Sequence, residues 1–334
     1  MQLDGIHPGD INRLLMRFLG KPGILFRVKR LLSVVVVALA LPASAYAWGG
    51  SYPTGDSFGS YVQIDVSDTY PVDQALPQDW ATYLGTLVHG PEISRLTLNL
   101  VPQGVVQTTC GAQALACYDP ERQAIYVSPE DQLDAPPAKE IVTHEYGHHL
   151  AKNSDDAPWA ALDYGTKRWS SYENICAKAA DGEASPGDEG AHYFQNSGEA
   201  FAESYRVLNL QKQGQTDITW DIVDRAFFPD ATALTLLQED ITTPWKGPAF
   251  TKLHGSFGNG VLRTFGVKTQ LDGSFVASLV SPTKAKMQLE LFNGSTIVSR
   301  GKSVRFKVCG ERALTLKVKR LSGRGAFTID LSKP

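Results

Sequence analysis

The sequence is poor in cysteine, has no apolar stretch of membrane-spanning length, and shows no internal repeat of the solenoid type. Only four cysteines occur in 334 residues, and no two have the C-x-x-C spacing, which argues against a zinc site built from cysteines. The longest apolar run, 31–42, is well short of the roughly 20 residues that a membrane-spanning helix needs, and Pro42 interrupts it. We therefore do not expect a membrane anchor.

That short apolar run belongs instead to an expected export signal. Basic residues in FRVKR (26–30) precede it, and small residues in ASAYA (43–47) follow it at the positions that a signal peptidase reads. We predict a secreted, extracellular protein whose leader and signal peptide, residues 1–47, is cleaved near Ala47. Met16 opens a conventional basic leader and is an alternative start of synthesis.

All four cysteines follow this leader. An exported protein meets an oxidising compartment, so its cysteines are expected to pair. Cys110 and Cys117 flank the short segment GAQALA and are the pair that we predict to form a disulfide. A bond between Cys176 and Cys309 would join distant parts of the chain, and the sequence leaves that pairing open.

Charge divides the rest of the chain into two unlike parts. Residues 48–255 carry 12 basic and 29 acidic side chains (net −17), whereas 256–334 carry 14 basic and 4 acidic ones (net +10). Such an asymmetry indicates two distinct modules. Two prolines and a glycine in TTPWKGPAF mark the boundary, so we predict domains at 48–245 and 256–334 with a linker at 246–255.

The second module is predicted to be a small antiparallel β-sandwich. Apolar and polar residues alternate in runs such as 287–291 and 314–318, and glycine-rich turns separate the runs. The stretches FGVKTQLDGSFVASLVSP, MQLELFNGSTIVS and GRGAFTIDLS weakly resemble the pre-peptidase C-terminal domain of secreted bacterial peptidases. Its positive charge favours contact with an anionic cell surface or with the acidic first module, and a solvated surface without a partner is the alternative.

In the first module, one strand and two helices carry the informative residues. The segment AIYVS (124–128) is typical of a strand. Two prolines at 136–137 then open a helix that contains KEIVTHEYGHHLAKN (139–153), because proline favours the first turn of a helix. A second helix is predicted over SGEAFAESYRVLNLQK (197–212), with Ser197 as its N-cap.

The first of these helices contains H-E-x-x-H, a spacing typical of catalytic zinc. His144 and His148 are four residues apart, so their imidazoles project from one helix face and can bind one ion. Glu145 between them is not a ligand in this motif but acts as general base. Such sites use three protein ligands and a water, so one ligand is still missing. His149 points about 100° away from His148 and is not expected to bind the ion.

The second helix offers that ligand. Glu199 and Glu203 are four residues apart in NSGEAFAES and share a face. The two helices together resemble the gluzincin division of the zinc metallopeptidases, where the first downstream acid ligates zinc and the second hydrogen-bonds a ligand histidine. The resemblance implies that Glu199 is the third Zn²⁺ ligand, that Glu203 orients His144, and that the module has an α+β zincin-like fold. The G-x-x-H extension of the metzincins is absent after His148.

The activity that this resemblance implies is that of a zinc metalloendopeptidase, a hydrolase. It would cleave peptide bonds with a zinc-activated water and with Glu145 as general base. One further donor would stabilise the oxyanion, and the sequence does not choose between His192, Tyr193, Tyr205 and His254. The strand at 124–128 is expected to pair with extended substrate, unless it lies inside the sheet.

Two other functions fit the same residues. In a secreted surface-binding protein the zinc helix would be structural or degenerate, and the β module would do the binding. A zinc hydrolase of non-peptide amides is the other. The expected partners are a peptide or protein substrate and an anionic cell surface, with no nucleic acid.

Overall fold

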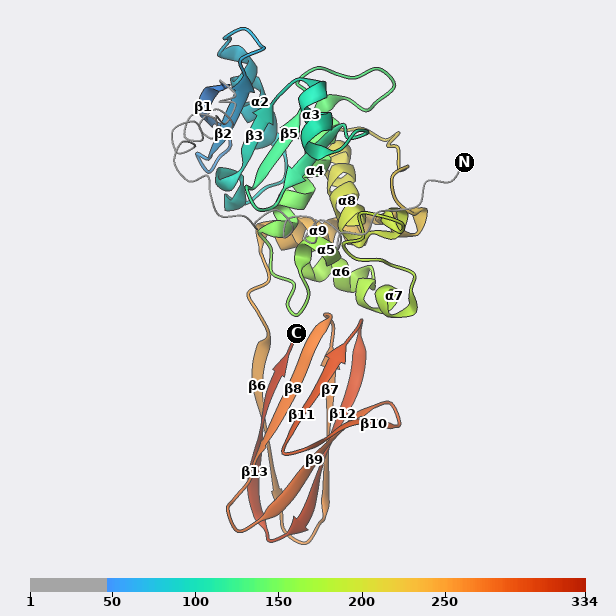
Figure 1. The fold of residues 1–334 in the computed structure, drawn as a ribbon. Helices are drawn as coiled ribbons and strands as arrows, with labels where there is room; N and C mark the ends of the chain where they lie inside the picture. Colours follow the sequence, from blue (N-terminus) through green and yellow to red (C-terminus); the bar gives the residue numbers. More distant parts are fainter. Residues whose placement is uncertain (1–46) are drawn as a thin grey trace, which may run out of the picture. The chain divides into compact units, whose positions relative to one another are not determined.

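The computed structural model describes residues 47–334, in which an α+β module is followed by an all-β module (Figure 1). This order agrees with the predicted fold class at that level. The predicted leader and signal peptide lies outside the described residues, except for Ala47 at the start of β1. No helix within 47–334 has both the length and the apolar character that a membrane span requires.

One layer of the first module is a five-stranded sheet in the order β1-β2-β3-β5-β4. Strands β2, β3 and β5 are parallel, and β1 and β4 run antiparallel to their neighbours at the two edges. Ile64, Leu98 and Ile125 are fully buried between this sheet and the helices. The strands are β1 (Ala47–Pro53), β2 (Tyr61–Ser67), β3 (Thr97–Leu100), β4 (Ala116–Asp119) and β5 (Ala124–Val127).

The strand predicted at 124–128 is thus confirmed as β5, but its expected pairing with substrate needs correction. Strands β3 and β4 occupy both sides of β5, so its backbone groups already have partners within the sheet. On this side of the sheet the edge strand is β4, whose outer side pairs with no other described strand. The alternative expectation, that this strand lies inside the sheet, is confirmed.

Helices form the rest of the first module. The two predicted helices are confirmed as α4 (Ala138–Lys152) and α8 (Ser197–Lys212), and Pro137 is the N-cap of α4. The predicted N-cap of α8 is wrong by one residue, because Asn196 accepts a hydrogen bond from Gly198 N at 2.9 Å, while Ser197 Oγ donates to a carbonyl outside the helix. The remaining helices are α2 (Ala75–Thr86), α3 (Gln103–Cys110), α5 (Ala161–Tyr164), α6 (Lys167–Tyr172), α7 (Ile175–Asp181) and α9 (Ala231–Thr242).

Helices α4 and α8 pack with almost no gap between their backbones. A Cβ atom placed on Gly147 of α4 would lie 2.7 Å from the Cα atom of Ala202 in α8. Tyr146 stacks on Tyr205 beside this point, with 5.8 Å between ring centroids, and both rings are fully buried. Glycine is therefore required at 147 because only its lack of a side chain permits this approach.

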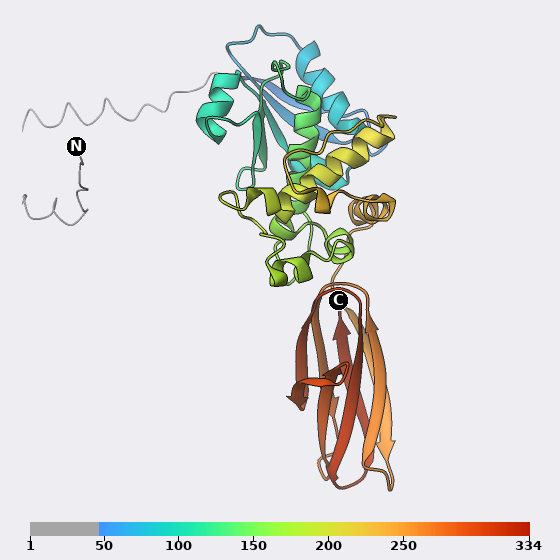
Figure 2. The same ribbon diagram turned by 90° about the vertical axis from the view of Figure 1, so that its right-hand side faces the viewer.

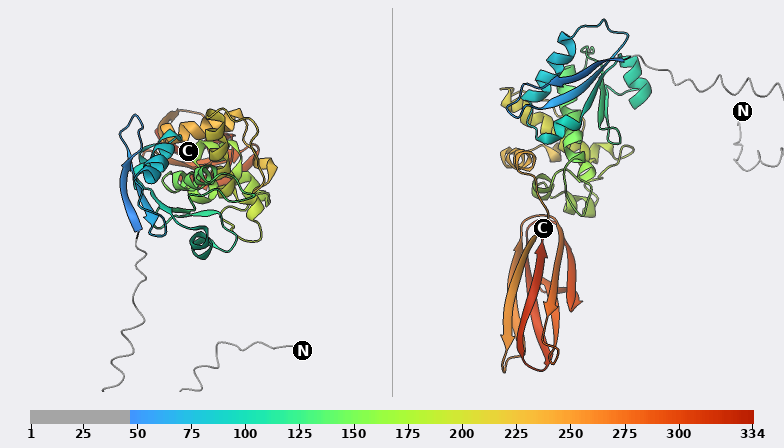
Figure 3. Two further views of the ribbon diagram at one scale, coloured as in Figure 1. Left: turned by 90° about the horizontal axis from the view of Figure 1, so that it is seen from above. Right: turned by 90° about the vertical axis from the view of Figure 1, so that its left-hand side faces the viewer.

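The second module is a β-sandwich of two four-stranded antiparallel sheets, β10-β9-β12-β7 and β11-β8-β13-β6 (Figures 2 and 3). Alternate residues such as Phe275, Leu289, Leu316 and Ile329 are fully buried between the sheets. The strands are β6 (Ala249–Phe257), β7 (Leu262–Thr269), β8 (Gly273–Val280), β9 (Lys286–Asn293), β10 (Thr296–Gly301), β11 (Ser303–Val308), β12 (Arg312–Ser322) and β13 (Gly325–Lys333).

The predicted linker at 246–255 therefore needs correction. Most of it belongs to β6, which pairs with β13 from Ala249 to Phe257. β6 is an edge strand and only Phe257 is buried in it, so the alternation that reveals an inner strand is missing from the sequence.

The four cysteines form two disulfides, and each disulfide joins cysteines that are consecutive in the sequence. Cys110 and Cys117 are bonded as predicted, with Cα atoms 5.8 Å apart. Cys176 and Cys309 are also bonded and join α7 to the β-sandwich. Next to this second bond, Asp272 donates its backbone N–H to Ser171 Oγ and accepts a hydrogen bond from Gly310 N. Two disulfides fit an oxidising, extracellular environment.

The contact at Gly147 yields a test of the fold. Gly147→Ala should destabilise the protein by about 1–3 kcal/mol, because the added methyl group overlaps backbone that cannot move aside. Gly104→Ala in α3 is the matched control, since a Cβ there meets nothing within 4 Å. Urea unfolding of both variants measures the difference. An equal effect of the two substitutions would contradict the account of this helix contact.

Candidate metal centre

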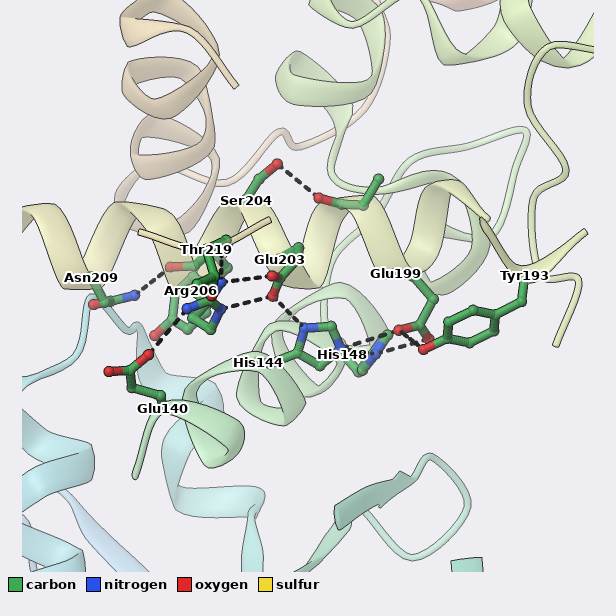
Figure 4. A network of polar contacts seen from close by, with 12 residues as sticks. Glu140, His144, His148, Tyr193, Glu199, Glu203, Ser204, Arg206, Asn209 and Thr219 are labelled. Carbon is green, nitrogen blue, oxygen red and sulfur yellow. Dashed lines mark hydrogen bonds and ion pairs between the residues drawn. The ribbon is translucent and has the colours of Figure 1, made fainter. Parts of the chain in front are cut away.

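Side chains from α4 and α8 converge on one point in the first module (Figure 4). His144 and His148 lie one turn apart on α4, and Glu199 faces them from the first turn of α8. Glu199 Oε2 lies 3.1 Å from His144 Nε2, and Glu199 Oε1 lies 3.2 Å from His148 Nε2. The two Nε2 atoms are 3.2 Å apart. The structure thus brings together the three residues that were predicted as ligands.

The spacing of the two imidazole nitrogens and the Glu199 carboxylate fits a small tetrahedral metal ion. Ligands bonded at about 2.0–2.2 Å to a tetrahedral ion lie roughly 3.3–3.6 Å from one another. The observed separations of 3.1 and 3.2 Å are close to that value. Two imidazoles and a carboxylate suit several divalent transition metals, so the geometry supports a metal site without identifying the metal.

The charges of this triad favour a cation. Burial raises the pKa of Glu199, but contacts with His148 and His144 outweigh burial and hold that pKa well below its ordinary value. Burial lowers the pKa of His144, and hydrogen bonds with Glu199 and Glu203 overcome this and raise it to about 10. A positive charge on or between these imidazoles, whether a proton or a metal ion, is therefore stabilised.

A buried ion-pair network fixes His144 from behind. Its Nδ1 lies 3.0 Å from Glu203 Oε2, so it donates to this carboxylate and leaves the Nε2 lone pair for a metal. Arg206 donates to both oxygens of Glu203, at 2.7 and 2.9 Å, and to Glu140 at 3.1 Å. These contacts hold the pKa of Glu203 down to about 2, against the effect of burial.

Sequence reasoning missed Arg206 and Glu140. The signal for both was in the helical spacing. Arg206 lies three residues after Glu203 on α8, and Glu140 lies four residues before His144 on α4. This spacing places Arg206 on the face of Glu203 and Glu140 on the face of His144, and Glu140 joins the network through its contact with Arg206.

Glu145 lies beside the triad without belonging to it. Its side chain lines the same cleft as His144 and His148. Burial raises the pKa of the Glu145 carboxyl, while the two histidines and a hydrogen bond from the backbone N–H of Tyr118 act in the opposite direction. The Glu145 carboxyl group thus lines the cleft close to both histidines and to the backbone of strand β4.

Of the four candidates for a second donor, Tyr193 is the one at the site. Its hydroxyl donates to Glu199 Oε2 at 2.8 Å, and burial together with Glu199 raises its pKa well above the ordinary value, so it remains protonated. His192 is exposed and pairs with an aspartate, Tyr205 is buried and donates to a backbone carbonyl, and His254 belongs to β6 of the sandwich.

The triad lies in a cleft of about 890 Å³. One wall is the segment 113–118, which includes the edge strand β4 and is tied to α3 by the Cys110–Cys117 disulfide. His149 is turned away from the triad, as expected. Its Nε2 lies 2.9 Å from Glu92 O, and its Nδ1 lies 3.1 Å from Tyr118 Oη.

Comparisons with known proteins identify no family. No protein-family model matches the sequence, and no curated protein matches it.

Some solved structures are weakly similar to a quarter of the chain. They include PliG of Aeromonas hydrophila, a periplasmic inhibitor of g-type lysozyme (9% identity, 26% of this chain, 89% of that one, TM-score 0.23). The Yersinia pseudotuberculosis-derived mitogen has 18% identity over 26% of this chain and 87% of that one, with a TM-score of 0.23. The pre-peptidase C-terminal domain of a Bacillus anthracis collagenase has 14% identity over 24% of this chain and 87% of that one, with a TM-score of 0.21. Scores this low do not establish a shared fold, and the likeness to the pre-peptidase domain stays a weak resemblance.

Proposed function

We propose that the protein is a secreted zinc-dependent metalloendopeptidase of the gluzincin type. The observation that carries the proposal is the convergence of two histidine nitrogens and a carboxylate within 3.1–3.2 Å of one another. A tetrahedral nitrogen-and-oxygen site of this size favours zinc over calcium, which takes six to eight oxygen ligands. The glutamate of H-E-x-x-H lines the same cleft, which gives the site a general base.

The chain's own residues would divide the work as follows. His144, His148 and Glu199 would hold the zinc ion, which supplies Lewis acidity for a water and for the scissile carbonyl. Glu145 would accept a proton from the attacking water and deliver it to the leaving amine. Its raised pKa makes the first half of that transfer easier, because the carboxylate of a weaker acid is a better proton acceptor. The resulting acid still releases its proton to the leaving amine, which is more basic than a carboxylate.

Tyr193 would be the second donor to the substrate. Its hydroxyl already lies at hydrogen-bond distance from Glu199, and it stays protonated at neutral pH. A donor placed where negative charge develops in the transition state lowers the barrier more than it aids substrate binding.

Substrate would lie along β4. The outer side of this edge strand pairs with no other described strand, and three of its residues line the cleft, so an extended peptide can add to it by backbone hydrogen bonds. Asp163, Glu189 and Asp221 also line the cleft. Their charge favours substrates with basic side chains.

Three substitutions test the metal assignment. Glu145→Gln should abolish peptide hydrolysis while about one equivalent of zinc stays bound, because the base is lost and the ligands are kept. Glu199→Ala should lose both metal and activity, because two histidines alone hold zinc weakly. Glu203→Ala should fall between these, with about a 10–100-fold loss in metal affinity or activity. Metal analysis and peptide cleavage, each with and without a chelator, give both readouts.

The prediction is that metal binding falls most in Glu199→Ala, less in Glu203→Ala, and not at all in Glu145→Gln. If Glu203→Ala released zinc while Glu199→Ala retained it, the two roles would be exchanged. Full activity of Glu145→Gln would contradict the peptidase assignment and favour a surface-binding protein whose zinc helix is structural.

Tyr193→Phe tests the donor. It should lower kcat by about 100-fold with little change in KM, because removing a transition-state donor costs roughly that much. Zinc content should stay at the wild-type level. His192→Phe is the matched control, since that side chain is exposed and lies outside the cleft lining. A fall in kcat for the control, or none for Tyr193→Phe, would exclude this role.

A further inference from the structure

One end of the β-sandwich combines basic and exposed apolar side chains. Three loops meet there, 258–261, 281–285 and 323–324, at the end away from the C-terminus (Figures 1 and 2). A Cβ atom on Gly323 would lie 2.4 Å from Lys284 O, which shows that the last two loops touch. We refer to these loops and the strand ends that flank them as the tip.

The tip carries six basic residues and no acidic one. All but Arg320 are exposed, and the six are Arg263, Lys284, Lys286, Lys319, Arg320 and Arg324. The four acids of residues 256–334 lie elsewhere. Asp272 and Glu311 are in loops at the opposite end of the sandwich, and Glu290 and Asp330 lie within strands.

These charges have no ion-pair partner within the described part of the chain. The ion pairs formed by the sandwich's strands are Lys252–Asp330 and Arg300–Glu290, and neither includes a tip residue. A ring of cations without partners creates a positive potential that attracts an anionic surface.

Large aliphatic side chains are exposed among these cations. Val261, Leu262, Val280 and Leu321 have 57%, 45%, 56% and 58% of their surface exposed. Val261, Leu262 and Leu321 lie side by side, because β7 pairs with β12 at Leu262 and Lys319, and Arg320 N donates to Val261 O at 2.9 Å. Val280 ends β8 in the other sheet.

Arg320 fixes the position of the loop that carries Val261. Its guanidinium donates to Gly258 O at 2.8 Å and to Asn259 O at 3.1 Å. Val261 is thus presented by a loop that hydrogen bonds hold in place, whereas Leu262, Val280 and Leu321 lie at the ends of β7, β8 and β12, so the exposure of all four is a property of the fold. Exposed apolar residues in a cluster usually mark a surface that another apolar phase covers.

We infer that the tip docks on a lipid bilayer with anionic headgroups, into whose surface the aliphatic side chains insert. A soluble polyanion would use the cations and leave the aliphatic residues in water. A bilayer satisfies both groups at once, because its anionic headgroups attract the cations and its acyl boundary accepts the apolar side chains. Docking would hold the cleft of the first module near substrates at that surface.

Vesicle co-sedimentation of the chain from residue 48 onward tests this inference. Vesicles of phosphatidylcholine with about one third phosphatidylglycerol should bind the protein, and pure phosphatidylcholine vesicles should bind it much more weakly. Lys284→Gln/Lys319→Gln/Arg324→Gln should lower the affinity by about 100-fold, since each basic residue near an anionic surface contributes about fivefold. The matched control Lys252→Gln/Lys268→Gln/Arg305→Gln removes the same charge away from the tip and should change the affinity much less.

A second variant separates a bilayer from a soluble polyanion. Val261→Ser/Leu321→Ser should lower vesicle affinity by about tenfold and leave binding to soluble polyglutamate unchanged. Equal losses in the tip and control triple variants, or full vesicle binding by the serine variant, would overturn the inference. Circular dichroism confirms that each variant is folded. Vesicle binding needs neither metal nor turnover, so failure here leaves the peptidase proposal intact.

Discussion

The contact between α4 and α8 is the constraint on which the candidate site depends. The histidine pair and the acid that faces it lie on different helices, and their ligand atoms must come within about 3 Å of one another. Gly147 allows the two backbones to approach until a single methyl group would not fit between them. Beside this glycine, one tyrosine from each helix stacks on the other and fills the space between the helices. Packing, rather than the motif alone, therefore creates the geometry for a metal ion.

The same contact creates an electrostatic problem that the fold solves locally. Three carboxylates, Glu140, Glu199 and Glu203, lie at or near the buried interface of the two helices, and burying charge without a partner is costly. Arg206 neutralises two of them, and the histidines or a bound cation neutralise the third. A chain of charge-assisted hydrogen bonds thus runs from Glu140 through Arg206 and Glu203 to His144. Such a chain sets the orientation of the imidazole before any metal binds.

Much of the site was predictable because helical periodicity is a strong signal. The spacing of His144 and His148, and of Glu199 and Glu203, placed each pair on one helix face, and the structure brings the two faces together. The sequence could not show which strands lie at the edge of a sheet. The strand predicted at 124–128 exists, but β4 covers its outer side, because an antiparallel hairpin returns there after a short turn. Strand β6 was mistaken for a linker because an edge strand with one buried residue has no visible alternation. Tyr193 could not be chosen over the other candidates, since its approach to Glu199 depends on the path of a loop.

The identity and position of the metal ion test the central claim most directly. A crystal of the zinc-loaded protein, with anomalous diffraction measured on both sides of the zinc absorption edge, locates the ion without reference to activity. The account predicts one zinc ion bonded to His144 Nε2, His148 Nε2 and a Glu199 carboxylate oxygen at about 2.0–2.2 Å, with a water in the remaining position. An ion ligated instead by a fourth protein side chain would show a closed structural site, and the absence of zinc from this point would contradict the proposed chemistry altogether.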